Sequence, residues 1–138
     1  MRSPTQNPPP GAGRDAPTRV LIADRSAHFR ETLRRVLAQR TNCEFVGEAA
    51  TLTEAVVRAT EADPNIVLLD FDLVVNESAA RLRHLAQAFP SLQVVVLLAD
   101  YSDDYRQAVR ERWGYECVAK DCVEEQLGRL FVSGKAVA

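Results

Sequence analysis

The feature that most constrains the fold of this chain is a fivefold alternation of short apolar runs with segments of helical periodicity. The apolar runs lie at residues 20–23, 45–46, 66–69, 94–98 and 117–119. Apolar residues at helical spacing follow each run, and Pro64 and Pro90 close the second and third helical segments. Strands that are apolar on both faces and joined by helices are typical of a parallel sheet covered on both sides. The sequence therefore predicts an α/β fold with five parallel strands.

The handedness of strand crossovers limits such a sheet to a few doubly wound orders, and we expect the flavodoxin-like order 2-1-3-4-5. Two helices would then cover one face and three the other. Residues 1–18 hold five of the seven prolines and little to bury, which is typical of a disordered tail. We therefore expect a Pro-rich N-terminal tail over residues 1–18 and a single domain over residues 19–138.

The composition narrows the functional class. A net charge of −2 gives no reason to expect nucleic-acid binding. The longest apolar stretch, Val94 to Ala99, is far too short to cross a membrane, and the N-terminus lacks the apolar region of a signal peptide. The cysteines Cys43, Cys117 and Cys122 form no CxxC pair, which favours buried or half-buried thiols in a reducing compartment. We expect a cytoplasmic protein without membrane association.

Three charged side chains stand at the ends of predicted strands. Asp24 follows the first apolar run, Asp70 the third and Lys120 the fifth, while Leu98 ends the fourth. Doubly wound sheets bind ligands at the carboxyl ends of their strands, so we expect two carboxylates and a lysine in one cleft. Taken singly, an aspartate after a strand is more often a helix cap, and a loop lysine is more often solvated. Taken together they suit a hard cation such as Mg²⁺.

Several short segments carry a recognisable pattern, in register, over about residues 19 to 131. They are Val-Leu-Ile-Ala-Asp24, His28-Phe29-Arg30, Val46-Gly47-Glu48-Ala49, Pro64-Asn-Ile-Val-Leu-Leu-Asp70 and Ala119-Lys120-Asp121. By these segments the chain resembles the receiver domains of response regulators in two-component signalling, and most of all the receivers of LuxR-type regulators. No helix-turn-helix follows the fifth helix in this sequence, so we expect no direct nucleic-acid binding by this chain.

The resemblance implies a role for each residue of the cleft. Asp70 would be the phosphoacceptor, and Lys120 would pair with the phosphoryl oxygens. Asp24, Asp70 and the backbone carbonyl of Asp72 would hold Mg²⁺, and no other cofactor is expected. The chemistry is an in-line phosphoryl transfer, in which the protein mainly positions groups and neutralises charge. The implied partner is a sensor histidine kinase or another signalling protein, and the chain is not expected to be an enzyme.

Four positions depart from the pattern of that family. Arg25 stands where a second acidic residue belongs, Leu98 replaces a serine or threonine, and Cys117 replaces the aromatic switch residue three positions before the lysine. The Pro-Gly after the acceptor is Val74-Val75, so residues 74–77 are expected to form an unusual loop.

These departures favour an atypical receiver, or pseudo-receiver, whose phosphorylation-dependent switching is weakened or absent. Arg25 adds a positive charge beside Asp70, and we expect it either to take part of the cation's place or to point its long side chain to solvent. We expect weak Mg²⁺ binding. The alternative is a conventional Mg²⁺-dependent phosphorylated receiver that tolerates its substitutions.

Four aromatic residues mark a predicted interaction face. Tyr101, Tyr105 and Trp113 flank or lie in the fourth helix, and Phe131 lies in the fifth. In receivers these helices form a common dimer and partner face, and aromatic residues are favoured interface anchors. We therefore predict a homodimer or partner contact here, with core or edge packing of the same rings as the alternative.

Two other functions are weighed against the receiver. Asp70-Phe71-Asp72 fits the first motif of haloacid-dehalogenase-like phosphohydrolases, but two strand-helix units precede it and no acidic pair ends a strand after Lys120. A flavin-binding flavodoxin-like protein needs a loop rich in glycine, serine or threonine after the first strand, and residues 24–27 do not supply one.

Overall fold

The computed structural model describes the backbone of residues 16–40, 42–75 and 79–132, with side chains over residues 16–40, 42–75 and 81–130. The strands are β1 (Thr18–Ala23), β2 (Cys43–Ala49), β3 (Ile66–Asp70), β4 (Gln93–Leu98) and β5 (Glu116–Ala119). The helices are α2 (Ala27–Ala38), α3 (Leu52–Ala62), α4 (Phe71–Val75), α5 (Ala79–Ala88), α6 (Asp103–Trp113) and α7 (Val123–Val132), with a 3₁₀ turn over Lys120–Cys122.

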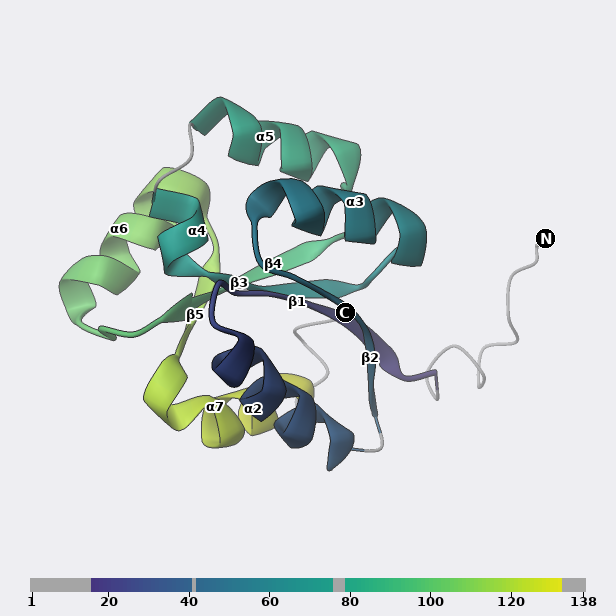
Figure 1. Cartoon of the computed structure of the whole chain (residues 1–138). Coiled ribbons are helices and arrows are strands. Elements are labelled where there is room, and N and C mark those ends of the chain that lie inside the picture. Colours follow the sequence, from purple (N-terminus) through teal and green to yellow (C-terminus); the bar gives the residue numbers. More distant parts are fainter. Residues whose placement is uncertain (1–15, 41, 76–78, 133–138) are drawn as a thin grey trace.

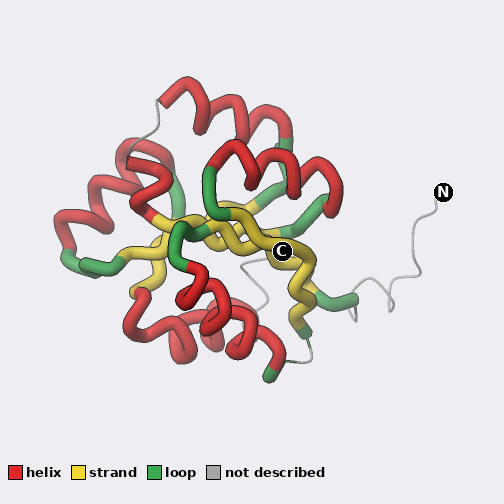
Figure 2. The backbone as a smooth tube through the Cα atoms, in the orientation of Figure 1, coloured by secondary structure: helices red, strands yellow, loops and turns green. Residues whose placement is uncertain are grey.

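The five strands form one parallel sheet in the order β2-β1-β3-β4-β5, as predicted. Helices α2 and α7 cover one face, and α3, α5 and α6 cover the other together with the short α4 (Figure 1; Figure 2). Strands β1 and β3 are neighbours at the centre, so their carboxyl ends meet at one place. Within the described part of the chain, no helix is long and apolar enough to span a membrane.

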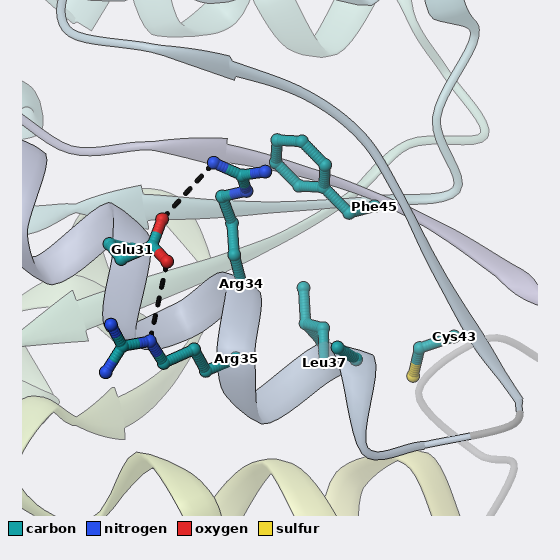
Figure 3. A pocket seen from close by; sticks show the side chains of 7 residues that line it. Glu31, Arg34, Arg35, Leu37, Cys43 and Phe45 are labelled. Carbon is teal, nitrogen blue, oxygen red and sulfur yellow. Dashed lines mark hydrogen bonds and ion pairs between the residues drawn. The ribbon is translucent and has the colours of Figure 1, made fainter.

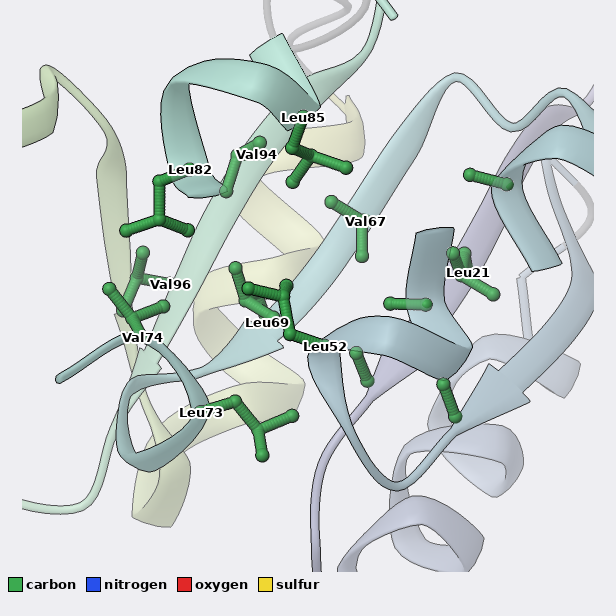
Figure 4. Close-up of a cluster of buried hydrophobic side chains, with 14 of the residues drawn as sticks. Leu21, Leu52, Val67, Leu69, Leu73, Val74, Leu82, Leu85, Val94 and Val96 are labelled. Atoms are coloured by element: carbon green, nitrogen blue, oxygen red, sulfur yellow. The ribbon is translucent and has the colours of Figure 1, made fainter. Parts of the chain in front are cut away.

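The core is split into two layers by the sheet. Along β3, Val67 and Leu69 pack against α3 and α5, whereas Ile66 and Leu68 pack against α2 and α7. This alternation follows the two-residue period of a strand, and it explains why the strands are apolar on both faces. Figure 4 shows the first layer, where side chains from β1, β3, β4 and the covering helices meet.

Side-chain caps and left-handed residues set the helix ends. Ser26, Thr51 and Ser102 each accept a hydrogen bond from the backbone N–H three residues ahead, at the starts of α2, α3 and α6. The carboxylate of Glu54 accepts in return from the N–H of Ala50, which gives the reciprocal pair of bonds typical of a capping box. The α6 helix ends at Gly114, whose φ of 73° suits glycine.

Three local predictions were wrong. Strand β1 begins inside the predicted tail, because the N–H of Thr18 donates to the carbonyl of Asn42, 2.8 Å away; residues 1–15 of that tail lie outside the described residues. Residues 74 and 75 belong to helix α4, not to a loop, because Val74 is buried in the core; the predicted loop positions 76 and 77 lie outside the described residues. Asp121, followed three residues later by Glu124, has the sequence pattern of a capping box for the last helix, but it lies within the 3₁₀ turn and does not cap α7.

Candidate functional site

The site is assembled by strand order. The pairing of Ala23 with Leu69 puts Asp24 and Asp70 side by side at the carboxyl edge of the sheet. Ala119 pairs with Leu98 at the end of β5, and Lys120 begins the 3₁₀ turn that follows. Residues nearly a hundred positions apart in the sequence are thereby brought together.

One ammonium group pairs with both buried carboxylates. Lys120 Nζ lies 2.7 Å from Asp24 Oδ2 and 3.2 Å from Asp70 Oδ1. The side chains of Asp24 and Asp70 are 1% and 5% exposed, and that of Lys120 is 20% exposed. The ammonium also lies 4.7 Å from the centre of the Phe29 ring, which is a cation–π contact. The predicted juxtaposition of Asp24, Asp70 and Lys120 is therefore present.

Backbone hydrogen bonds hold both carboxylates in place. Asp24 Oδ1 accepts from the N–H of Ser26 at 2.8 Å, and Asp70 Oδ1 accepts from the N–H of Asp72 at 3.1 Å. Arg30 donates to the carbonyl oxygen of Asp24 at 2.7 Å and pairs with Glu48 at 2.6 Å. Asp24 thus makes the local turn contact typical of an aspartate after a strand while its second oxygen faces the cleft.

The cluster shifts the titration of two of its members. Burial raises the pKa of Asp70, the Asp24 carboxylate raises it further, and the Asp72 N–H and Lys120 only partly offset both. Burial lowers the pKa of Lys120, but its contacts with Asp24 and Asp70 outweigh this, and the net direction is upward. Lys120 therefore stays charged at neutral pH. The ionised form of Asp70, in contrast, lowers the free energy of unfolding.

Replacing Asp70 with asparagine is expected to raise the free energy of unfolding at neutral pH. Folding raises the pKa of Asp70, so its ionised form destabilises the folded state, and this penalty appears as pH rises above the ordinary aspartate pKa of about 3.9. Burial is the larger cause of this penalty and repulsion from the Asp24 carboxylate the smaller. Burying a charged group costs several kcal/mol when it is unpaired. Because Lys120 offsets part of this, we expect a gain of about 1 to 2 kcal/mol at pH 7 that shrinks towards pH 3.

Urea unfolding between pH 3 and 7, followed by the fluorescence of Trp113, measures this gain. The exposed Asp104 on α6 provides the matched control, and Asp104→Asn should show no comparable rise with pH. An Asp70→Asn variant less stable than the unmodified chain at neutral pH would show that the carboxylate is not held at a cost.

Arg25 pairs with Asp72 and not with Asp70, which corrects the sequence prediction. Its Nη2 lies 2.8 Å from Asp72 Oδ2, and both side chains are more than half exposed. An exposed pair of this kind is worth about 0 to 1 kcal/mol, so it forms without large gain or penalty. The guanidinium therefore lies beside Asp72, in the exposed part of the site.

A small hollow opens at the acceptor. Its volume is about 140 Å³, and its lining consists of Asp70, Phe71, Asp72, Leu98, Ala99, Asp100 and Tyr105. Leu98 is buried, so an apolar side chain without a hydroxyl stands at the end of β4. Sequence reasoning missed Asp100 and the place of Tyr105. The available signal was position, since both follow β4 closely and Tyr105 falls in the first turn of α6.

The remaining predicted residues lie elsewhere. Cys117 is half-buried and lines a second hollow with Tyr101, between β5 and α7, where burial raises the pKa of its thiol. Tyr101 and Trp113 are half-buried, and Arg106 and Arg112 lie over their rings. Tyr105 is 42% exposed, and the side chain of Phe131 lies outside the described residues.

A further hollow, of about 370 Å³, lies between α2 and β2, away from the strand ends (Figure 3). Its arginines are already engaged: Glu31 pairs with Arg34 at 3.2 Å and with Arg35 at 3.4 Å, and Arg34 lies over the Phe45 ring. These contacts satisfy its charges internally. The acceptor edge is therefore the stronger candidate for chemistry.

The oxygen atoms at the acceptor edge are ligands that Mg²⁺ prefers, but two positive side chains already pair with the carboxylates there. Asp24, Asp70 and Asp72 offer the oxygen ligands that Mg²⁺ prefers. Lys120 and Arg25, however, already pair with those same carboxylates. Among the side chains that the structure describes, no group of three or more His, Cys, Asp or Glu is arranged to hold a metal ion.

Comparisons with known proteins agree with this geometry. Residues 20–131 match the model of the response regulator receiver domain. The chain is 34% identical over 85 residues to the transcriptional regulatory protein YhcZ of Bacillus subtilis, covering 62% of this chain and 39% of YhcZ. It is also 34% identical over 139 residues to a protein-glutamate methylesterase/protein-glutamine glutaminase of Anaeromyxobacter dehalogenans, covering 94% of this chain and 38% of that protein.

Solved structures show the same fold. The non-phosphorylated receiver domain of the stress response regulator RcsB from Escherichia coli superposes with a TM-score of 0.75 at 20% identity, over 86% of this chain and 93% of that one. The chain spans about two fifths of the length of YhcZ and of the Anaeromyxobacter dehalogenans protein. Asp70 and Asp72 both lie within the residues that match the receiver model. The chain belongs to the response regulator receiver domain family of two-component signalling.

Proposed function

We propose that this chain is an atypical receiver whose phosphorylation-dependent switching is weakened, and that it acts through protein–protein contacts. The observation that carries the proposal is the buried, hydroxyl-free Leu98 in the lining of the acceptor hollow, beside an Asp24–Asp70–Lys120 cluster that keeps the acceptor chemistry of the family. Around this cluster, Arg25 holds Asp72 and Leu98 lines the acceptor hollow. The core of the site is thus retained, while its metal-binding and signal-reading parts are altered.

In the proposed reaction, a carboxylate oxygen of Asp70 attacks the phosphorus of a phosphodonor. The new O–P bond forms as the bond from phosphorus to the donor's leaving atom breaks, and the leaving group departs on the opposite side. The described contacts of the Asp70 carboxylate both use Oδ1, so we assign Oδ2 as the attacking oxygen. The Lys120 ammonium would then pair with the phosphoryl oxygens as well as with the carboxylates.

Mg²⁺ would neutralise charge at this step, held by Asp24, Asp70 and the backbone carbonyl of Asp72. Lys120 competes with it for the carboxylate oxygens of Asp24 and Asp70. Arg25 pairs with the side-chain carboxylate of Asp72 and so adds positive charge beside the ligands. Arg25 can also neutralise an incoming phosphodonor, but without the fixed geometry of a metal ion. We therefore propose slow phosphorylation and weak metal binding.

Mg²⁺ is expected to bind with a dissociation constant of about 1 mM or weaker, and Arg25→Asp should tighten binding at least about tenfold. The variant removes the Asp72 partner and adds a ligand oxygen, and tenfold corresponds to about 1.4 kcal/mol. Amide NMR titration with MgCl₂ measures both constants. Arg83→Asp on α5 makes the same charge change on the surface and should leave binding nearly unchanged. Binding by the unmodified chain well below 1 mM would contradict the proposal.

A conventional receiver is the second candidate, favoured by the intact Asp24–Asp70–Lys120 cluster. Acetyl phosphate or beryllofluoride with Mg²⁺, read by mass spectrometry and amide NMR, separates the two. Rapid, near-complete modification of Asp70 with a large conformational response would favour the conventional receiver. Slow or absent modification supports the atypical one.

The proposed partners are a sensor histidine kinase or another cytoplasmic signalling protein, and a second copy of this chain. The proposed contact surface lies at the β5 edge of the sheet, where α6 from one side and α7 from the other meet the edge strand. We call it the face made by α6 and α7. On it, Tyr105 is exposed, and Tyr101 and Trp113 are half-buried. Arg110 is exposed on α6 and lies near Cys117 of β5, where burial raises the pKa of the thiol and the Arg110 guanidinium lowers it to a smaller extent. Its charge offers a way to test the contact without removing a packed ring.

Sedimentation equilibrium is expected to show a monomer–dimer equilibrium in the micromolar range, and Arg110→Glu should weaken it about tenfold. Charge reversal places a like or unpaired charge at the contact. Arg83→Glu on α5 lies outside this face and should leave the equilibrium unchanged. A chain that stays monomeric at millimolar concentration would refute the homodimer.

A further inference from the structure

The outer wall of the acceptor hollow is built by an aromatic pair. Tyr105, from the first turn of α6, and Phe71, directly after the acceptor, meet edge to face with ring centroids 5.6 Å apart and an interplanar angle of 77°. Both rings line the hollow that contains Asp70 and Leu98. The N–H of Tyr105 donates to the capping Ser102, which fixes the start of α6 beside the hollow. A signalling helix thus contributes directly to the acceptor site.

The hollow is small compared with the molecules that must react there. Its volume of about 140 Å³ is below the roughly 300 to 1,000 Å³ of ordinary ligand sites. Asp70 and Leu98 are both buried at its base. A phosphodonor carries its leaving group in line with the attacked phosphorus, on the side away from Asp70. The exposed residues of the lining are Asp72, Ala99, Asp100 and Tyr105, and Tyr105 carries the largest side chain among them. The leaving group must therefore pass a rim that includes the Tyr105 ring.

We propose that the Tyr105 ring is a steric gate for phosphodonors, held against Phe71 when closed and swung into solvent when open. The inference rests on the proposed function, because it concerns access to Asp70. Tyr105 is 42% exposed, so its ring has solvent to move into without displacement of the helix. It acts as a specificity-determining residue: donors with bulkier leaving groups are slowed more than small ones.

The reaction rate depends on the fraction of molecules in which the Tyr105 ring is in the open position. Exposed side chains change rotamer within nanoseconds, far faster than phosphoryl transfer, so the reaction rate scales with the open fraction. An edge-to-face pair is a weak contact, which keeps the open state populated. Removal of the ring is expected to raise the rate about threefold to tenfold.

The test compares the rates at which Asp70 is modified by phosphoramidate, acetyl phosphate and phosphoimidazole, in that order of leaving-group size, read by mass spectrometry. Tyr105→Ala should accelerate all three, with the largest gain for phosphoimidazole. Tyr105→Phe keeps the ring and should behave like the unmodified chain. Gln107→Ala, on α6 but outside the hollow, is the matched control.

The same rates are measured in an Arg25→Asp background, which separates this inference from the proposed function. Acceleration by Arg25→Asp but not by Tyr105→Ala overturns the gate and leaves the proposed function standing. The reverse pattern supports the gate and contradicts the role of Arg25. Slowing by Tyr105→Phe would assign a role to the phenol hydroxyl and overturn the gate. A chain that remains unmodified even with both substitutions also overturns it, and urea unfolding confirms that each variant is folded.

Discussion

Replacing Lys120 with methionine is expected to lower the free energy of unfolding by about 3 to 5 kcal/mol, the usual penalty for leaving a buried charge without its partner. Here two buried carboxylates, Asp24 and Asp70, lose the same ammonium. Methionine keeps most of the apolar length of the side chain but removes the ammonium, together with its cation–π contact with Phe29. A domain of this size has a total stability of about 5 to 15 kcal/mol, so the variant loses a large share of it.

Urea unfolding followed by circular dichroism and Trp113 fluorescence gives this value. Two further variants separate charge from packing. Arg25→Met removes the exposed partner of Asp72 and should change stability by about 1 kcal/mol or less. The double variant Lys120→Met with Asp70→Asn should recover part of the loss, because only one carboxylate then remains unpaired. A Lys120→Met variant as stable as the unmodified chain would contradict the account of this cluster.

Replacing Leu98 with threonine is expected to tighten beryllofluoride binding by about tenfold to a hundredfold. A hydrogen bond to a charged group contributes roughly 1.5 to 3 kcal/mol, and Leu98 lines the acceptor hollow without a donor. Moving a two-state equilibrium from almost all off to almost all on takes about 5.5 kcal/mol. The missing hydroxyl therefore accounts for a large share of the coupling that a conventional receiver has.

Leu98→Val is the matched control, because valine has the shape of threonine without its hydroxyl. It opens the same space but should gain little affinity. Adding Cys117→Tyr to Leu98→Thr should extend the response into α6 and α7, since Cys117 lines a hollow of about 320 Å³ beside Tyr101 and Leu130 that offers room for a ring. Equal gains for valine and threonine would show that size and not hydrogen bonding limits the site.

The fold was predictable because burial on both faces leaves a direct trace in the sequence. Strands such as β3 are apolar throughout, and the helices between them carry one apolar face, so element order and sheet order followed. The meeting of Asp24, Asp70 and Lys120 was predictable for the same reason, since each follows a strand whose place in the sheet was known. Strand order alone brings their backbones to one edge.

Side-chain direction was not predictable. Arg25 was expected beside Asp70, but a long exposed side chain has many rotamers, and it pairs instead with Asp72. Tyr105 was expected at an interface or in core or edge packing, yet the first turn of α6 places its ring at the acceptor hollow. Val74 and Val75 were assigned to a loop because the Pro-Gly of the family is missing there. Both residues instead belong to α4, which buries Val74 and leaves Val75 exposed.

The central claim is that phosphorylation at Asp70 is poorly coupled to the face formed by α6 and α7. The most direct measurement is the set of amide chemical shifts of the unmodified chain before and after beryllofluoride and Mg²⁺. We expect incomplete occupancy, with shift changes confined to the surroundings of Asp24, Asp70 and Lys120. Large changes across residues 101–131 at modest beryllofluoride concentration would show a working switch and contradict the claim.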